Sequence, residues 1–505
     1  MQAATKVVLN TAVLYAKILV SMTIALLSIP LVLKALGASD YGLYNLVAGV
    51  VAMLSFLNNS MTVSSQRYMS VAMGANDESR INVVYNTSFY LHLLLGGIVF
   101  LCLEIGLFFL DNLNIPIDRI GTAQILFQLL ILTTFCRIIS VPFDAIMNAH
   151  EDMVAFSVIE LIDSVLMLVI ATTLQYISVD RLIFYGCAVF FIAFLTLLMK
   201  YGWAYYKYKK YRINLNKYKS QLQTSDMFGF AGWNLFGGLA LMGRNQGVAV
   251  IINLFLGTIA NAAYGIANQI NAALCNFAST FQRAINPQLM KSEGMGDRSR
   301  LMKISFITSK FSVLAICLFA IPLIVEMPDV LQIWLHGSIP PFTMELSCCI
   351  LFLSIITQYS MGIMSAIQAA GKIRNYQIVI GCLILLNIPF AYLLLKKGFA
   401  IYYVVICYIF IEFLSFFIRL LFAKNIVDMQ PKDYFIQVIK PTVLVAIIPI
   451  ILCLIPHFLV ENIWARLIST IGIYVISYCV MMWFIAIDIS QRDGILQKLH
   501  IKKIR

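Results

Sequence analysis

The sequence is poor in charge. Asp, Glu, Lys and Arg together make up 12% of its 505 residues, whereas hydrophobic residues make up 61%. Soluble domains carry about 25% charged residues, so this chain has too little polar surface to cover a water-facing globule. Most of its apolar surface must face lipid, and we expect an integral membrane protein. The net charge of +12 then reports orientation in a membrane and not a nucleic-acid partner.

Motifs for metals, cofactors and redox chemistry are also missing. The eleven cysteines form no C-x-x-C pair and no Cys/His cluster with the spacing of metal ligands, and the five histidines are dispersed. Nearly all of the cysteines fall inside apolar runs, where a thiol packs as a small hydrophobic group. We therefore expect no cofactor and no metal site.

Long apolar runs are what the sequence has instead. A membrane-spanning helix needs about 20 largely apolar residues, and we count fourteen such runs, from Val7–Leu33 to a last pair at Pro441–Val460 and Ala465–Ile487. Fourteen crossings return both termini to one side. Lys and Arg concentrate in the loops that share this side with the N terminus, so the positive-inside rule predicts that both termini are cytoplasmic.

The most basic stretch divides the chain. Residues Lys200–Lys219 include seven basic residues and no acidic ones, interleaved with Tyr and Trp, a mixture typical of a cytoplasmic membrane interface. The sequence thus predicts an N-terminal six-helix lobe (1–203), a basic cytoplasmic linker (204–226), a C-terminal six-helix lobe (227–422), and a segment with helices 13 and 14 and a cytoplasmic tail (423–505).

The loops on the predicted outer side are all short. The largest covers about residues 326–343 and contains no cluster of acids, bases or arginines. An enzyme that works on glycans outside the membrane needs such a cluster in a sizeable loop. We therefore expect a protein that is not an enzyme, with a membrane glycan polymerase or ligase as the weaker alternative.

The two predicted lobes share short sequence matches. Gly74–Ile81 recurs as Gly294–Leu301 and Leu36-Gly37 recurs as Leu256-Gly257, both at an offset of 220 residues. Two further matches, at offsets of 223 and 216, join Tyr41–Asn45 to Tyr264–Asn268 and Gln66-Arg67 to Gln282-Arg283. The predicted fold is therefore an all-α membrane protein of fourteen transmembrane helices, with two parallel six-helix repeats plus a C-terminal helix pair. Such halves can rock against each other around a central cavity and give alternating access.

Charged residues inside spanning runs mark candidate sites, because each costs at least about 2.5–3.5 kcal/mol near the bilayer centre. Lys17 and Arg244 fall in the first helix of each lobe. We interpret them as a cationic cavity for a phosphate or pyrophosphate group; the alternative is that each pairs with an intramembrane acid. Arg67 and Arg283, at matching inner helix ends, either contact phosphate at the cytoplasmic mouth or anchor the topology.

Four acids also fall inside apolar runs: Glu104, Glu160, Asp163 and Glu412. Glu160 and Asp163 are three residues apart, hence on one face of a helix. They are candidates for binding a coupling cation or proton, or for neutralising Lys17.

The turn motifs carry a resemblance to a known family. The segment Leu36–Tyr44 (LGASDYGLY) resembles the LG-x-x-x-YGLY turn of polysaccharide transporters in the multidrug/oligosaccharidyl-lipid/polysaccharide (MOP) exporter superfamily, particularly Wzx-type O-antigen flippases. The stretch from Leu256-Gly257 to Asn286-Pro287 looks like its second-half counterpart, and Ala369–Lys372 resembles the turn after helix 10.

The resemblance implies a flippase in the bacterial cytoplasmic (inner) membrane. Its cargo would be undecaprenyl-pyrophosphate-linked oligosaccharide repeat units of the O-antigen or capsule type, and its partners the lipid bilayer and polysaccharide assembly proteins. The runner-up within transport is a cation-coupled small-molecule or drug exporter, which would need Glu160, Asp163 or Glu412.

Overall fold

The computed structural model describes residues 2–52, 55–107, 117–214, 224–335, 339–487 and 492. Within these ranges all regular structure is helical. Eleven helices are long and apolar enough to cross a membrane, or twelve if α11 (Thr343–Tyr359) and α12 (Met361–Ala370), bent by 42°, form one span. The prediction of a multi-pass, all-α membrane protein is confirmed. The count of fourteen helices and the repeat layout stay predictions. The predictions for linker residues 215–223 and for almost all of the tail fall on residues outside the described ranges.

Two of the helices are too long to be single spans. Helix α1 (Gln2–Ala52) has 51 residues and α8 (Thr224–Gly294) has 71, or about 75 and 105 Å at 1.5 Å per residue, against a hydrocarbon core of about 30 Å. Each breaks at a glycine: Gly37 (φ 80°, ψ 165°) and Gly257 (φ 78°, ψ −174°). This backbone region is open to glycine almost alone. Both breaks fall in the Leu-Gly turns that the sequence motifs indicate.

The chain divides into two compact units. The N-terminal unit comprises Met1–Gly238 and Ala284–Asp297, and the C-terminal unit comprises Leu239–Arg283 and Arg298–Arg505. The boundaries therefore cut α8 twice and do not coincide with linker 204–226. The four-segment division of the sequence stays a prediction.

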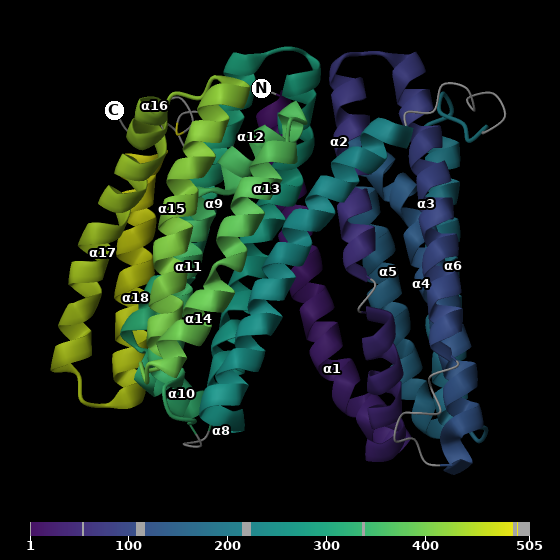
Figure 1. Cartoon of the computed structure of the whole chain (residues 1–505), viewed down its shortest axis with the longest axis horizontal. Helices are drawn as coiled ribbons and strands as arrows, with labels where there is room; N and C mark the ends of the chain where they lie inside the picture. The colour runs from purple at the N-terminus through teal and green to yellow at the C-terminus, as the bar shows by residue number, and fades with distance from the viewer. Residues whose placement is uncertain are drawn as a thin grey trace, which may run out of the picture. The chain divides into compact units, whose positions relative to one another are not determined.

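The N-terminal unit is a bundle of long helices joined by short turns (Figure 1). After α1 come α2 (Ser55–Gly74), α3 (Glu78–Leu107), η2 (Ile117–Arg119), α4 (Ile120–Ala149), α5 (Met153–Thr173), η3 (Leu174–Tyr176) and α6 (Arg181–Lys207). At one end of the bundle, Arg119 bonds Asp40 after the Gly37 break and lies 2.7 Å from Asp180, which caps the first turn of α6. We call the opposite end, where α2, α4 and α6 finish, the basic end.

The first part of the basic linker is fixed on this unit. Asn82 and Asn86, one turn apart on α3, hydrogen-bond the linker backbone at Lys210, Arg212 and Asn214. Asp152 before α5 accepts hydrogen bonds from Trp203, Lys207 and Tyr208. Burial alone would raise the pKa of Asp152, but these hydrogen bonds outweigh burial and hold the pKa below its usual range.

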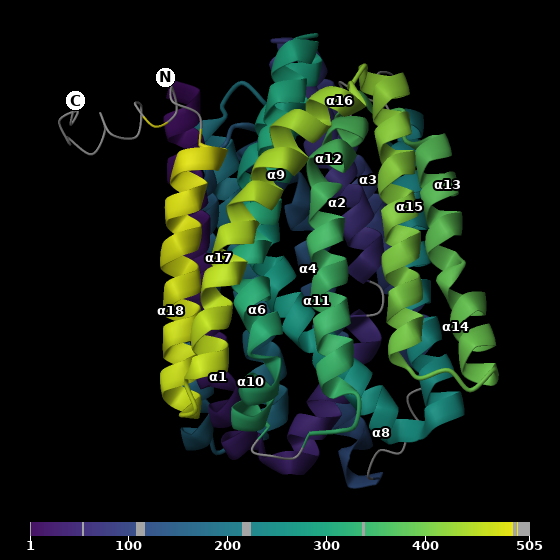
Figure 2. The ribbon, with the colours of Figure 1, turned by 90° about the vertical axis from the view of Figure 1, so that its left-hand side faces the viewer.

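The C-terminal unit holds the remaining helices (Figure 2). They are the central part of α8, α9 (Arg298–Val325), α10 (Met327–Trp334), α11, α12, α13 (Arg374–Leu385), α14 (Asn387–Lys396), α15 (Tyr402–Val427), α16 (Pro431–Tyr434), η5 (Phe435–Ile439), α17 (Lys440–Leu459), α18 (Ile463–Met481) and η6 (Met482–Ala486). The last two long helices, α17 and α18, lie side by side and both contact α9. The hydroxyls of Tyr474 and Tyr478 on α18 donate to the carbonyls of Cys317 and Leu314 on α9, each at 3.0 Å.

Candidate functional site

A cluster of charged side chains lies inside the N-terminal unit, and we call it the charged pocket. Its centre is Lys200 on α6, whose side chain is 5% exposed. The Nζ atom of Lys200 lies 3.0 Å from Asp144 on α4 and 2.8 Å from Glu160 on α5. Glu160 also faces Lys17 on α1 at 3.6 Å. Side chains from four helices thus meet around two shared carboxylates.

The pocket has a volume of about 240 Å³. It is lined by Asn58, Thr62, Arg137, Ser140, Val141, Asp144, Glu160, Asp163, Ala193, Thr196, Leu197 and Lys200. Asp163 accepts a hydrogen bond from Thr196 at 3.0 Å. The buried Oδ1 atom of Asn58 accepts no hydrogen bond within the described part of the chain, so a polar acceptor is available to a guest.

The charges of the pocket balance. Three carboxylates, Asp144, Glu160 and Asp163, stand against Arg137, Lys200 and, through Glu160, Lys17. Inside a membrane protein an unbalanced charge is costly, so one added proton or cation changes the energy of the whole cluster. Glu160 contacts two cations at once, and protonating it would weaken both contacts and leave Lys200 with Asp144 alone. The arrangement can therefore couple ion binding to movement of α1, α5 and α6.

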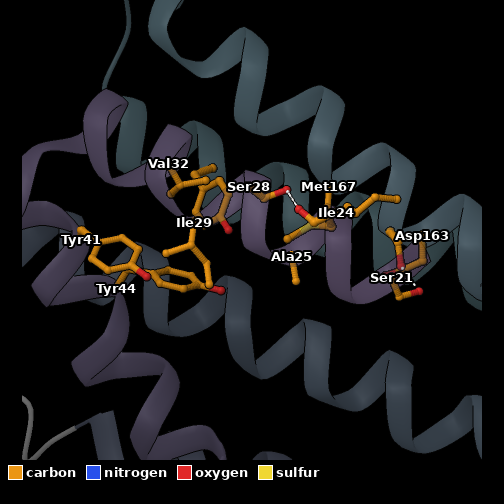
Figure 3. A pocket seen from close by; sticks show the side chains of 12 residues that line it. Ser21, Ile24, Ala25, Ser28, Ile29, Val32, Tyr41, Tyr44, Asp163 and Met167 are labelled. Atoms are coloured by element: carbon orange, nitrogen blue, oxygen red, sulfur yellow. Dashed lines mark hydrogen bonds between the residues drawn. The ribbon is translucent and has the colours of Figure 1, made fainter. Parts of the chain in front are cut away.

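A second cavity, which we call the tyrosine pocket, adjoins the first. It has a volume of about 310 Å³ and shares Asp163 with the charged pocket. Figure 3 shows Asp163 and Ser21 at one end and Tyr41 and Tyr44 at the other, with aliphatic side chains of α1 between them. It is thus amphipathic: hydroxyls and one carboxylate at its ends, and Ile, Val, Ala and Met along its walls.

The predicted cationic residues occupy different surroundings. Lys17 pairs with Glu160, as the alternative interpretation expected. Arg244 in the C-terminal unit is half-buried, bonds the side chain of its neighbour Asn245 at 2.9 and 3.1 Å, and lies over the ring of Tyr408. Arg67 is 8% exposed and contacts aromatic rings, whereas Arg283 is exposed. A phosphate-binding role for these four residues stays a prediction.

The predicted acids separate into two groups. Glu160 and Asp163 lie together in the charged pocket. Glu104 accepts a hydrogen bond from Gln128 on α4 at 2.9 Å, and Glu412 forms a buried ion pair with Arg419 two turns further along α15. Their roles in ion coupling stay predictions, but the geometry assembles an ion-binding group only around Glu160 and Asp163 among these four.

Sequence reasoning missed three residues of the pocket. Arg137 lies inside a predicted span and was a visible signal. Asp144 was missed because the apolar run stops at Val141, whereas α4 continues through Pro142 to Ala149. Lys200 is the first residue of the basic stretch and looked like an interfacial lysine, yet α6 continues to Lys207 and its packing buries the Lys200 side chain.

No protein-family model and no curated protein matches the chain. Solved structures do. An outward-facing multidrug-resistance MATE family transporter of the MOP superfamily matches with a TM-score of 0.71 at 14% identity, over 83% of this chain and 95% of that one. A MOP superfamily transporter from Pyrococcus furiosus gives 0.70 at 13% identity, over 83% and 95%. A MATE structure in complex with MaD3S gives 0.72 at 14% identity, over 85% and 97%.

Proposed function

We propose that the protein is a secondary transporter that exports an amphipathic substrate by alternating access, with the charged pocket as its ion-coupling site. Its structural neighbours, MATE family transporters of the MOP superfamily, support a membrane exporter fold. The observation that carries the proposal is the four-helix contact of Lys17, Asp144, Glu160 and Lys200. Such a group adds little to the stability of a helix bundle, because well-packed apolar side chains in its place would stabilise the bundle about as much.

The chemistry of coupling follows from the shared carboxylate. When Glu160 is ionised, it draws α1 and α6 toward α5 through Lys17 and Lys200. When Glu160 takes up a proton, Asp144 alone remains to neutralise Lys200, and Lys17 loses the one carboxylate it contacts in the described residues. The favoured state then separates α1 from α5. A conformational change of this kind needs a differential interaction of the ion with two states, which this exchange of partners supplies.

For the cargo, we propose first an undecaprenyl-pyrophosphate-linked oligosaccharide. This proposal comes from the LG-x-x-x-YGLY resemblance and from the extra length of this chain relative to the solved structures that it matches. The solved structures are matched over 95–97% of their own length but cover only 83–85% of this chain. The segment 423–505, with α17 and α18, is about a sixth of the chain, which is the size of that extra length.

The second candidate cargo is a small amphipathic molecule. The structural neighbours include a multidrug-resistance transporter, and the tyrosine pocket, at about 310 Å³, lies at the small end of the range for drug-sized ligands. A carboxylate at its end and aromatic rings along it suit an organic cation. Asp163, the one acid that lines the tyrosine pocket, favours a cation over an anion at that end.

One reconstitution experiment tests the function and separates the two cargoes. Purified protein in liposomes with an imposed pH gradient is given either a fluorescent polyprenyl-pyrophosphate oligosaccharide or a fluorescent organic cation. We expect movement of one of them that stops when Glu160→Gln is introduced and continues with the control Glu345→Gln, an acid outside the pocket. Failure to move either cargo in any gradient would contradict the proposed function.

A further inference from the structure

The repeated motif Gly-x-x-Asp occurs at Gly74–Asp77 and at Gly294–Asp297. The first glycines of the two copies contact each other's helix. Gly74 ends α2 and Gly294 ends α8, and both lie in the N-terminal unit because that unit includes Ala284–Asp297. A β-carbon added to Gly74 would lie 2.2 Å from the carbonyl oxygen of Lys291. One added to Gly294 would lie 2.0 Å from the carbonyl oxygen of Val71. The contact is reciprocal, and we call it the glycine crossing.

Space is what requires glycine at both positions. Neither Gly74 nor Gly294 has a positive φ, so an alanine would fit the backbone conformation of each. The obstacle is the facing main chain, which cannot rotate away as a flexible side chain would. Real β-carbons essentially never approach other atoms below 3.0 Å. Any side chain at either position must therefore push the two helix ends apart.

The helix ends on the two sides of the crossing have the same local structure. After α2, the amides of residues 75, 76 and 77 donate to the carbonyls of residues 71, 73 and 72. After α8, the amides of residues 295, 296 and 297 donate to the carbonyls of residues 291, 293 and 292. Asn76 and Gly296 take the left-handed conformation at the same point. Two identical helix terminations thus meet as a matched pair.

The side chains beside the crossing are polar and mostly buried, with Glu151 and Gln288 each 7% exposed. Glu151, in the turn after α4, forms an ion pair with Lys291 and accepts a hydrogen bond from Gln288 at 3.1 Å. Its carbonyl accepts from Asn10 on α1 at 3.2 Å. Opening the crossing would expose these polar groups at the end of the bundle, where hydrogen bonds to water can replace the ones they lose.

The position of the segment in the chain adds a mechanical argument. Ala284–Asp297 packs with the N-terminal unit, yet the residues before and after it, Leu239–Arg283 and from Arg298 on, belong to the C-terminal unit. If the two units rock against each other, this segment must either let go of α2 or part from its own neighbours in sequence. The helix α8 is continuous through Ala284, so release from α2 is the less disruptive change.

We propose that the glycine crossing is a releasable clasp, closed in this structure and open in the alternate conformation. The proposal rests on the proposed transport function, because only alternating access demands that the clasp opens. The crossing lies at the basic end, which the sequence predicts to be cytoplasmic. Closing and opening of the clasp would therefore act at the side of the membrane that the sequence predicts to be cytoplasmic.

The test measures the clasp without any substrate. Spin labels are attached at Ala75→Cys and Met295→Cys, both exposed at the crossing, in full-length protein in nanodiscs with its eleven native cysteines replaced by alanine. We expect two distance populations, short and long. Gly74→Ala or Gly294→Ala should shift the distribution to the long population, by tenfold or more.

The chain offers matched controls. Gly49 on α1 and Gly265 on α8 precede Gly74 and Gly294 in the sequence and have nothing within 4 Å of an added β-carbon. Gly49→Ala and Gly265→Ala should leave both populations as they are. Circular dichroism and size exclusion on all four variants identify any that fails to fold; for such a position, Lys291→Ala, which removes the ion pair and leaves the glycines, replaces it.

Two outcomes would overturn the proposal. One is a single short distance in the parent protein that the glycine variants leave unchanged. The other is full transport after the label positions are cross-linked to each other, which would make the crossing a permanent joint. If no transport is found but the two distance populations exist and respond to Gly74→Ala, the clasp stands and the proposed function fails.

Discussion

The charged pocket of the N-terminal unit and the Glu412–Arg419 pair of the C-terminal unit arrange buried charge in opposite ways. In the N-terminal unit, charged residues from four helices share partners around a cavity of about 240 Å³. In the C-terminal unit, Glu412 and Arg419 pair with each other on a single helix, with side chains 6% and 4% exposed, and the Nζ of Lys310 caps the carbonyl of Ala486 at 2.8 Å. In the charged pocket Glu160 and Lys200 each have two partners on different helices, whereas Glu412 pairs with Arg419 on its own helix.

This difference assigns different roles to the units. Partners that can be exchanged between helices let a bound ion favour one conformation over another. The Glu412–Arg419 pair lies on one helix and can move with α15 as a whole, although Arg419 also donates to Ser360 outside that helix. Under the proposed function we expect ion sensing at the charged pocket and a structural role for the Glu412–Arg419 pair.

The largest expected effect is on the stability of the C-terminal unit. Glu412→Gln leaves Arg419 buried without its carboxylate, and removing one partner of a buried ion pair costs about 3–5 kcal/mol. We expect a correspondingly lower thermal midpoint in detergent. The double variant Glu412→Met/Arg419→Met should recover most of the loss, because an apolar replacement of both partners is close to neutral. A double variant as unstable as Glu412→Gln would contradict the structural role.

The next effect is on transport, in the N-terminal unit. Lys200→Met removes the cation that Asp144 and Glu160 share, so Asp144 loses its ion pair and Glu160 keeps only its contact with Lys17. We expect the transport rate of reconstituted protein to fall at least about tenfold, equivalent to ~1.4 kcal/mol. Lys310→Met, a buried lysine of the other unit, is the matched control and should retain coupling to the ion gradient. Equal loss of coupling in both variants would erase the contrast between the units.

A smaller effect is expected where α18 meets α9. Tyr478→Phe removes the hydroxyl that donates to the carbonyl of Leu314 at 3.0 Å. A single hydrogen bond contributes about 1 kcal/mol, so the thermal midpoint should fall slightly while transport is retained. Tyr403→Phe, an exposed tyrosine of α15, should change neither quantity. Loss of ion coupling in Tyr478→Phe would show that the C-terminal unit also takes part in sensing.

The smallest effect concerns pH at the Arg119 end of the N-terminal unit. Burial acts to raise the pKa of Asp180. The backbone N–H groups of Ile183 and Leu182 and the nearby Arg119 lower it by more, so the pKa lies below its usual value. A carboxyl whose pKa is lowered by folding stabilises the fold above its unfolded pKa of about 3.9, and this contribution disappears as the pH falls through the lower folded value.

The measurement compares the parent protein with Asp180→Asn. The parent should have the higher thermal midpoint at pH 6, and the two midpoints should converge as the pH approaches 3. Transport at neutral pH should be the same in both, because Asp180 lies outside the charged pocket. A difference in midpoint that stays constant with pH would show that the carboxylate is not the stabilising group.

Much of the fold follows from composition and local pattern. Sparse charge and long apolar runs predict membrane-spanning helices, since nothing else satisfies the backbone in lipid. The Leu-Gly turns at Gly37 and Gly257 were visible because only glycine accepts that conformation. Part of the site was visible too: Glu160 and Asp163 are acids where lipid-facing residues are expected, three apart on one helix.

The partners of those acids were decided by tertiary structure. Lys17 is a lone cation in the sequence, and only the packing of α1 on α5 shows that it faces Glu160. Asp144 lies beyond the apolar run of its helix, and Lys200 begins the basic stretch at the predicted membrane interface, so only the continued helices bring the two together. The sequence by itself determined that some charges lie within membrane-spanning helices, because the length and hydropathy of an apolar run are properties of each helix. Which charge meets which depends on how helices far apart in the chain pack, and local pattern carries no record of that.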